Sequence, residues 1–233
     1  MKILSIDTSN IICSSAYVEL EKFKRDFYIR KIDQINTETG FMHSVNLFKD
    51  LECLIENNKI DFQKIDFITV AAGPGSYTGL RIGVAAALGL SKPYNTKIKY
   101  VSSLYSLSYN IDFDCDYIIS IIDAKVDRVY FCLYDKYKKQ LINEQIVNIN
   151  DLIFLLNKYF YDIDKQFALV GDAVINYKNI IDNNLKINYM ISEDNYNNAE
   201  SVAIASTNVK SSKLPVVNYM QKSQAERNFD DRT

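Results

Sequence analysis

The chain has 233 residues, of which 48% are hydrophobic and 24% are charged, and its formal net charge is −2. This is the composition of a soluble globular protein with one large domain or two of about 100 residues. No apolar run approaches the ~20 residues that a membrane helix needs. The slight acidic excess argues against a protein that holds nucleic acid by its own charge, because phosphate binding draws on clustered lysines and arginines.

The N-terminus and the cysteines indicate a cytoplasmic protein. Asp7 ends the N-terminal apolar run early, so the segment is neither a signal peptide nor a transit peptide. The cysteines are too far apart for a C-x-x-C pair, which predicts reduced and mostly buried thiols. They are Cys13, Cys53, Cys115 and Cys132.

The first half of the sequence predicts three strands, a helix and a further strand. β-rich segments at 2–6, 13–20 and 27–32 indicate an antiparallel meander. Apolar residues recur with the spacing of one helical face over 44–58. The nearly continuous apolar run 65–72 is typical of a central strand that is covered on both faces.

A glycine-rich segment, residues 73–79, reads G-P-G-S-Y-T-G and follows this central strand. It is not a Walker loop, because no G-K-[ST] follows, and its spacing differs from the dinucleotide fingerprint. The turn after the first strand also carries small polar residues, and open α/β sheets commonly build a ligand crevice at such strand ends. The segment is either a phosphate cradle at the start of a helix or a tight turn that seats this helix. The predicted crevice residues are Asp7, Thr8, Ser9, Gly73, Gly75 and Ser76.

The helix that begins near Ser76 carries a stripe of small residues, Gly79, Gly83 and Ala86. Glycine in a helix interior costs about 1 kcal/mol relative to alanine, so the stripe suggests that another backbone packs closely here. That neighbour is either the chain's own sheet or a helix of a partner. Pro93 then ends the helix, and a strand returns at 98–102.

The second half partly repeats the first. The I-I-S-I-I-D sequence at 118–123 leads into a strand at 128–134, much as I-L-S-I-D leads into the strand at 13–20. This repeat suggests a duplicated unit. A strand at 140–149, a helix at 151–159, a strand at 167–170 and helices at 176–182 and 199–206 complete the prediction.

Seven stretches carry a family resemblance: I-L-S-I-D-T-S, H-S-V-N-L-F, A-G-P-G-S-Y-T-G-L-R-I-G-V-A-A-A-L-G-L, V-S-S-L-Y-S-L, S-I-I-D-A-K-V-D-R-V-Y, V-G-D-A and S-Q-A-E. In this order, and over nearly the full chain, they resemble the TsaB family, formerly called YeaZ. The resemblance implies an α/β fold of the actin-like ATPase (ASKHA) type, with two related lobes that each hold a mixed sheet flanked by helices. We expect an N-terminal lobe at 1–110, a C-terminal lobe at 111–220 and a mobile tail at 221–233.

The resemblance also implies a function. TsaB-like chains are non-catalytic, homodimeric subunits of the machinery that makes N6-threonylcarbamoyladenosine (t6A) at position 37 of tRNA, together with the catalytic paralogue TsaD and the ATPase TsaE. We therefore expect tRNA to bind only through the complex, ATP to be used by the complex, and no cofactor to be bound tightly by this chain. The two predicted helices at 44–58 and 76–90 would form a bundle with a second copy or with TsaD. The predicted interface residues are Leu47, Leu51, Leu80, Arg81, Gly83, Val84 and Ala87.

Two features of the residues agree with a non-catalytic role. TsaD carries an H-x-x-x-H metal pair where this chain has V-S-S-L-Y-S-L, and neither Ser103 nor Leu107 can replace an imidazole ligand. Gly171 is the one glycine after Gly89, so the second lobe lacks the glycine turns with which actin-like kinases clamp nucleotide phosphates. The alternative is an actin-like phosphotransferase that uses ATP on a small substrate, with Asp7 positioning the metal–nucleotide.

Other chemistry-bearing residues favour structural roles. His43, the single histidine, precedes the first helix, where it is a capping or surface residue. Asp123 and Asp127 end a hairpin, and Lys125 between them offsets their charge. The 17 tyrosines are scattered among apolar runs, which favours half-buried strand positions over base-stacking platforms.

Overall fold

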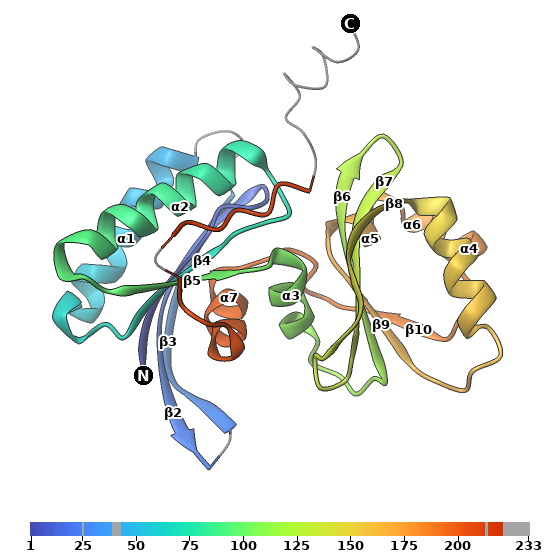
Figure 1. Ribbon diagram of the computed structural model, residues 1–233, viewed down its shortest axis with the longest axis horizontal. Coiled ribbons are helices and arrows are strands. Elements are labelled where there is room, and N and C mark those ends of the chain that lie inside the picture. The colour runs from blue at the N-terminus through green and yellow to red at the C-terminus, as the bar shows by residue number, and fades with distance from the viewer. Residues whose placement is uncertain (25, 39–42, 213, 221–233) are drawn as a thin grey trace, which may run out of the picture.

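The computed structural model describes residues 1–24, 26–38, 43–212 and 214–220. The chain forms two lobes, each built around a five-stranded mixed sheet (Figure 1). The first sheet holds β1 (Lys2–Asp7), β2 (Ile12–Phe23), β3 (Asp26–Glu38), β4 (Phe67–Ala71) and β5 (Lys97–Val101). The second holds β6 (Tyr117–Lys125), β7 (Arg128–Asp135), β8 (Gln140–Asn148), β9 (Phe167–Val170) and β10 (Tyr189–Ile191).

The first sheet has the strand order β3-β2-β1-β4-β5. The antiparallel meander of β1, β2 and β3 is confirmed. β4 lies parallel between β1 and β5, and its residues after Phe67 are buried, as the continuous apolar run predicts for a strand covered on both faces.

Helices cover both faces of the first sheet. α1 (His43–Asn58) and α2 (Tyr77–Ser91) pack on one face with the larger apolar core. α2 begins after Ser76, whose Oγ accepts a hydrogen bond from the Gly79 amide as an N-cap. α7 (Ala199–Ala205) packs on the opposite face against β1, β2 and β4 (Figure 1).

The second sheet repeats the first, as the sequence repeat suggests. Its order β10-β9-β6-β7-β8, read from the other edge, places β6, β7 and β8 as an antiparallel meander beside the parallel pair β9 and β10. α4 (Ile149–Phe160) and two short helices cover its outer face (Figure 1). The helix predicted at 176–182 corresponds to α6 (Lys178–Asn184). The short helix α5 (Asp172–Asn176) before it and the strand β10 are not predicted by the sequence patterns.

The region between the lobes is a third core. α3 (Ser103–Leu107) follows β5 and packs with Leu104 and Leu107 against the inner face of the second sheet.

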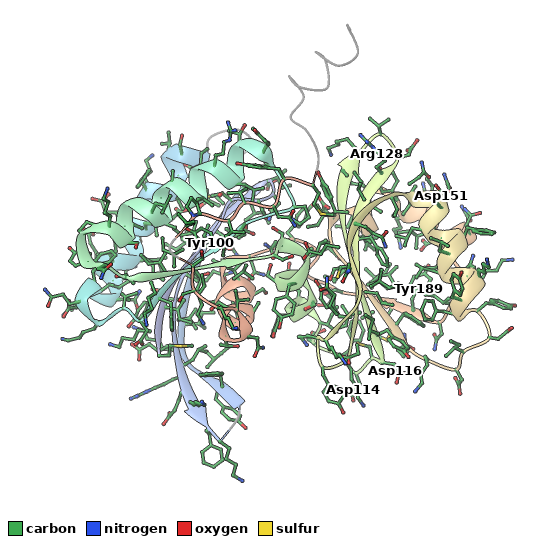
Figure 2. The ribbon with its side chains drawn as sticks, viewed as in Figure 1. Tyr100, Asp114, Asp116, Arg128, Asp151 and Tyr189 are labelled. Carbon is green, nitrogen blue, oxygen red and sulfur yellow. The ribbon has the colours of Figure 1, made fainter. Side chains whose placement is uncertain are left out.

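Each lobe also has a core of its own. Tyr100 of β5 belongs to the core of the first lobe, and Tyr189 of β10 packs against the core of the second (Figure 2). No helix in the described part of the chain is long and apolar enough to cross a bilayer.

The lobe assignment of the C-terminal part differs from the prediction. Residues 111–220 were assigned to the second lobe, but α7 packs on the first sheet, and the segment 214–220, here called the strap, crosses back over the first lobe. Asn218 N donates to Ala72 O at 2.7 Å. The first sheet would otherwise leave an apolar face uncovered, which only a helix from the end of the chain fills. The predicted tail, 221–233, lies outside the described residues.

Candidate functional site

The predicted crevice residues lie together at one edge of the first sheet. β1 and β4 are parallel neighbours, so the turn after Asp7 and the turn at 73–75 leave the sheet side by side. Ser76 N donates to Ser9 O at 2.7 Å, and Thr8 Oγ1 donates to Gly79 O at 2.7 Å. The first turn of α2 is therefore hydrogen-bonded directly to the turn that follows β1.

The glycines of this segment are required by close backbone contacts. A Cβ atom on Gly75 would lie 2.5 Å from Ser9 O, and one on Gly79 would lie 1.9 Å from Thr8 O. On the other side of the turn, Gly73 has φ +103°, and a Cβ there would lie 2.6 Å from Asn218 O of the strap. Carbonyl oxygens of this chain thus occupy the space that side chains at these three positions would need. In this conformation the segment is a packed turn that seats α2.

Asp7 lies at the centre of the crevice and is fully buried. Its carboxylate accepts hydrogen bonds from Ser9 N at 2.7 Å and from Asn10 Nδ2 at 3.2 Å. Burial raises the pKa of Asp7 to about 6, although hydrogen bonds from Ser9 and Asn197 lower it. The carboxylate is already occupied by donors of its own chain.

An asparagine-rich loop between β10 and α7 closes the crevice from the second lobe. Asn197 accepts a hydrogen bond from Asn10 Nδ2 through its carbonyl at 2.8 Å, and its side chain contacts Ser106 Oγ and Ser9 Oγ. Asn195 Oδ1 accepts from Gly171 N at 3.1 Å. A cavity beside this loop has a volume of about 10 Å³, the room for one water molecule. It is lined by Ser9, Asn10, Leu107, Ile122, Asp172, Asn195, Tyr196 and Asn197.

Asp172 is a second buried carboxyl at this cavity, and the sequence patterns did not single it out. It opens α5 after Gly171, and its Oδ1 accepts a hydrogen bond from Asp123 N at 2.8 Å. Burial raises the pKa of Asp172 to about 6. One signal could have found it. The V-G-D sequence at the end of the strand predicted at 167–170 resembles the I-D-T-S sequence at the end of β1. Asn195 and Asn197 carry no periodic signal because they lie in an irregular loop.

The carboxylate Asp123 has the structural role that the sequence predicts. Lys125 Nζ lies 2.6 Å from Asp123 Oδ2 at the end of the β6–β7 hairpin. Burial acts to raise the pKa of Asp123, but hydrogen bonds from Lys125 and Asn176 hold it below its usual value. The Lys125 ammonium therefore offsets the charge of Asp123, and Asp127 contributes its carbonyl to Ile149 N at 2.8 Å.

The structure corrects the predicted interface residues. Leu47, Leu51, Leu80, Gly83, Val84 and Ala87 are all buried inside this chain, and of the predicted set only Arg81 is exposed. A Cβ on Gly83 would lie 2.5 Å from Thr8 Oγ1, so the small-residue stripe packs on the chain's own sheet. Helical periodicity identifies the apolar face of a helix, but it does not say which surface that face meets.

The outward faces of α1 and α2 carry a different set of residues. On α1, Val45 is 50% exposed and Phe48 is 57% exposed. On α2, Ala85 and Gly89 are exposed, and a Cβ on Gly89 would meet no atom within 4 Å. We call these four residues the outer helical face. It combines apolar side chains with small residues that another helix can approach.

Arg81 packs against a pair of tyrosines at the N-terminal end of α2. Its guanidinium lies 4.2 Å from the centre of the Tyr77 ring, and its Nε donates to Tyr219 Oη of the strap at 3.3 Å. The Tyr77 and Tyr219 rings are 4.6 Å apart. These contacts fix the strap against α2.

The positions that correspond to the metal pair are buried. Ser103 is fully buried, and Leu107 is 1% exposed in the core between the lobes. Across the described ranges, no group of three or more His, Cys, Asp and Glu side chains could hold a metal ion. α1 begins at His43, whose side chain lies outside the described part. The four cysteines form no disulfide bond with one another; Cys13 and Cys132 are buried, Cys115 is half-buried and Cys53 is exposed.

Comparisons with known proteins agree on one family. The family model for TsaD, tRNA N6-adenosine threonylcarbamoyltransferase, matches residues 37–228. The tRNA threonylcarbamoyladenosine biosynthesis protein TsaB of Bacillus subtilis is 30% identical over 184 residues, which cover 78% of this chain and 76% of that protein. TsaB of Buchnera aphidicola from Acyrthosiphon pisum is 26% identical over 81% of this chain and 82% of its own.

Solved structures show the same fold. A Pseudomonas aeruginosa protein described as similar to peptidase YeaZ superposes with a TM-score of 0.74 at 17% identity, over 94% of this chain and 99% of that one. An activator of 2-hydroxyisocaproyl-CoA dehydratase from Clostridium difficile, with bound ADPNP, gives a TM-score of 0.50 at 11% identity, over 88% of this chain and 94% of that one. The arrangement of the two lobes is thus shared with a nucleotide-binding protein of the actin-like ATPase fold.

Proposed function

The chain belongs to the TsaB family of tRNA threonylcarbamoyladenosine biosynthesis proteins, and from this membership we propose that it is a non-catalytic scaffold subunit of t6A synthesis. It supports the transferase TsaD, together with the ATPase TsaE, in the cytoplasm. It binds tRNA within the complex, which uses ATP, and this chain itself holds no nucleotide tightly.

The packed crevice is the observation that carries this proposal. Carbonyl oxygens of Thr8, Ser9 and Asn218 face the glycine turn, and the asparagine-rich loop fills the space opposite Asp7. A nucleotide between the lobes would have to displace Asn197, which is 3% exposed and hydrogen-bonded to Asn10 after β1 and to Ser106 of α3. These contacts favour a fixed interlobe geometry, which suits a scaffold and does not suit a kinase that opens and closes around ATP.

The outer helical face is the surface that we propose for assembly. Val45 and Phe48 are large apolar side chains in solvent, and Ala85 and Gly89 of α2 are small exposed residues that another helix can approach. A helix pair of a second copy, or of TsaD with its related fold, would bury this face in a bundle. The proposed interface thus still lies on α1 and α2, as the sequence predicts, but it is formed by other residues of these helices.

A reconstituted transfer assay tests the proposal. The reaction contains TsaD, TsaE, threonylcarbamoyl-adenylate and unmodified tRNA, and the incorporation of labelled threonine into tRNA is measured with and without this chain. We expect no transfer by this chain alone and a strong dependence of transfer on it in the full mixture. Transfer that proceeds equally well without the chain would overturn the scaffold role. Micromolar ATP binding and steady ATP hydrolysis by the isolated chain would favour the phosphotransferase instead.

A further inference from the structure

β2 and β3 continue beyond the rest of the first sheet as a two-stranded arm (Figure 1). The pairing of β1 with β2 ends at Lys2 and Glu19, whereas β2 and β3 remain paired as far as Phe23 and Asp26. We define the arm by its described residues, 21–24 and 27–30. A ribbon of two strands is marginally stable without a further layer, so the apolar side chains along it are not explained by core formation alone.

Aromatic and aliphatic side chains project from the arm into solvent. Phe23 is 62% exposed, Tyr28 is 56% exposed and Ile29 is 45% exposed. The Phe23 and Tyr28 rings form an edge-to-face pair with centres 6.5 Å apart. Flat rings held side by side on an exposed ribbon are a platform on which other planar groups can stack.

The same arm concentrates positive charge. Positions 21–30 contain four lysines and arginines and two acidic residues, Glu21 and Asp26, and so carry a net charge of +2 in a chain whose net charge is −2. Lys22 Nζ lies 5.8 Å from the centre of the Phe27 ring, and Lys24 Nζ lies 5.6 Å from that of Phe23. Neither lysine is within 4 Å of an acidic group among the described residues. The rest of the chain carries the acidic excess, so a polyanion is attracted to the arm and repelled elsewhere.

Charge pairing at the base of the arm limits this basic surface. Glu19 is paired with Lys2 at 3.7 Å and accepts a hydrogen bond from Tyr17 Oη at 2.7 Å. Arg30 and Lys31 also act on the Glu19 carboxylate, whose pKa is lowered chiefly by the Tyr17 hydrogen bond. The cations available to a ligand are therefore mainly those nearest the tip, Lys22 and Lys24.

We propose that the arm binds single-stranded RNA that passes around the tip of the hairpin. Unstacked bases lie against Phe23 and Tyr28 on one face, and the phosphates lie against Lys24 at the turn and Lys22 on the opposite face. Proteins read RNA mostly at loops, where bases are splayed and can stack on aromatic rings. This inference rests on the proposed function, in which the substrate adenosine lies in the anticodon loop of tRNA. That role favours RNA over a lipid surface, which exposed aromatic and basic residues can also bind. The arm would hold the loop while the partner subunit performs the chemistry.

Fluorescence anisotropy with the full-length chain tests the arm directly. The probes are a labelled, unmodified tRNA transcript and its anticodon stem-loop, titrated over a range of salt concentrations. We expect the double variant Lys22→Glu/Lys24→Glu to weaken binding at least tenfold. We also expect it to lower the slope of log K against log salt by about 1.4, because two phosphate contacts to a single strand are lost. The variant Phe23→Ala/Tyr28→Ala should weaken binding with little change in that slope.

The β7–β8 turn supplies a matched control. Tyr137 is 79% exposed there, and Lys136 Nζ lies 5.2 Å from the centre of its ring. The variants Lys136→Glu/Lys139→Glu and Tyr137→Ala change the same kinds of side chain in another exposed hairpin. We expect them to alter RNA affinity less than twofold. Arm variants that bind RNA as tightly as the native chain would overturn the proposal, and so would arm-dependent binding to vesicles of phosphatidylcholine and phosphatidylserine without RNA binding.

Two further measurements separate the arm from the scaffold role. In the transfer assay, arm variants should raise the KM for tRNA and leave kcat within about twofold, while the mass of the complex with TsaD stays the same. If native chain supports transfer but arm variants keep the native KM, the arm proposal fails and the scaffold role stands. If native chain does not support transfer, anisotropy still decides whether the arm binds RNA.

Discussion

Asn218 Nδ2 donates a hydrogen bond to Glu144 Oε2 at 2.9 Å and thereby ties the strap on the first lobe to β8 of the second. Ser102 Oγ donates to the other oxygen of the same carboxylate. Burial raises the pKa of Glu144, whereas these two donors lower it. Met220, two residues after Asn218, packs against the core between the lobes. The strap therefore joins the glycine turn, α2 and the second lobe.

We expect Asn218→Ala to loosen this connection. The loss of a hydrogen bond to a charged group should lower the free energy of unfolding by about 1.5–3 kcal/mol, and protease cleavage within the strap should become faster. Urea denaturation and limited proteolysis measure these two effects. Leu214→Ala changes a 75% exposed residue of the same segment and should have almost no effect. Equal stability of the two variants would contradict the structural role of the strap.

The buried Asp7 should make stability depend on pH in a defined direction. Its pKa is raised from 3.8 to about 6 on folding by burial, so between these values the folded state binds more protons than the unfolded state. The free energy of unfolding therefore falls as the pH rises through this window. Asp7→Asn removes this contribution, and its free energy of unfolding relative to the native chain should rise by up to about 3 kcal/mol between pH 4 and pH 7.

Chemical denaturation of both proteins at several pH values checks the Asp7 prediction. The amide of an asparagine at position 7 would place one donor against Asn10 Nδ2, which lowers the stability of the variant at every pH. The test is therefore how the difference in free energy of unfolding between the variant and the native chain changes with pH, not the size of that difference at one pH. Asp172→Asn should show the same trend, since burial raises the pKa of Asp172 to about 6. A difference that is constant from pH 4 to pH 7 would refute the raised pKa of Asp7.

Two glycines of α2 should respond in opposite ways to the same substitution. Gly79→Ala places a Cβ 1.9 Å from Thr8 O, where backbone must move, so we expect a loss of about 3 kcal/mol or more. Gly89→Ala points into open space and should raise the stability of the isolated chain by about 0.5–1 kcal/mol, because alanine is the better helix former. Urea denaturation of the isolated chain measures both. Destabilisation by Gly89→Ala would show that this position is enclosed.

The outer helical face should control assembly without affecting folding. Phe48→Asp removes a 57% exposed apolar side chain from α1, and Phe154→Asp makes the same change at a 65% exposed position on α4. We expect Phe48→Asp to weaken self-association and TsaD binding at least tenfold in light scattering, whereas Phe154→Asp leaves both masses unchanged. Thermal midpoints should be similar for the two variants. Identical association of both variants would place the interface elsewhere.

Much of the fold follows from local patterns. The meander from β1 to β3, the buried strand β4 and the amphipathic helix α1 are each specified by a short-range signal, namely alternation, a continuous apolar run or a period of 3.6 residues. β10 is the exception, because a strand of three residues at the edge of a sheet carries no periodic pattern. The helix α5 was also missed, because five residues are too few to show a helical period.

The candidate site was predictable only in part. Asp7 and the glycine turn were found because polar residues at strand ends have a local signature, and both lie at the same edge of the sheet. Asp172, Asn195 and Asn197 were not found, since they reach the crevice from the other lobe or from an irregular loop. Their proximity depends on contacts between residues far apart in the sequence, such as the one between Asn10 and Asn197.

The sequence by itself predicted most of the helices and strands, the glycine turn before α2 and a repeat between the two halves of the chain. Only the tertiary structure decided which way each apolar face points and what fills the space between the lobes. The stripe at Gly79 and Gly83 has the same pattern whether it meets a partner helix or its own sheet, and the contacts with Thr8 settle that choice. Burial is a property of all neighbours together, so a pattern along one segment cannot fix it.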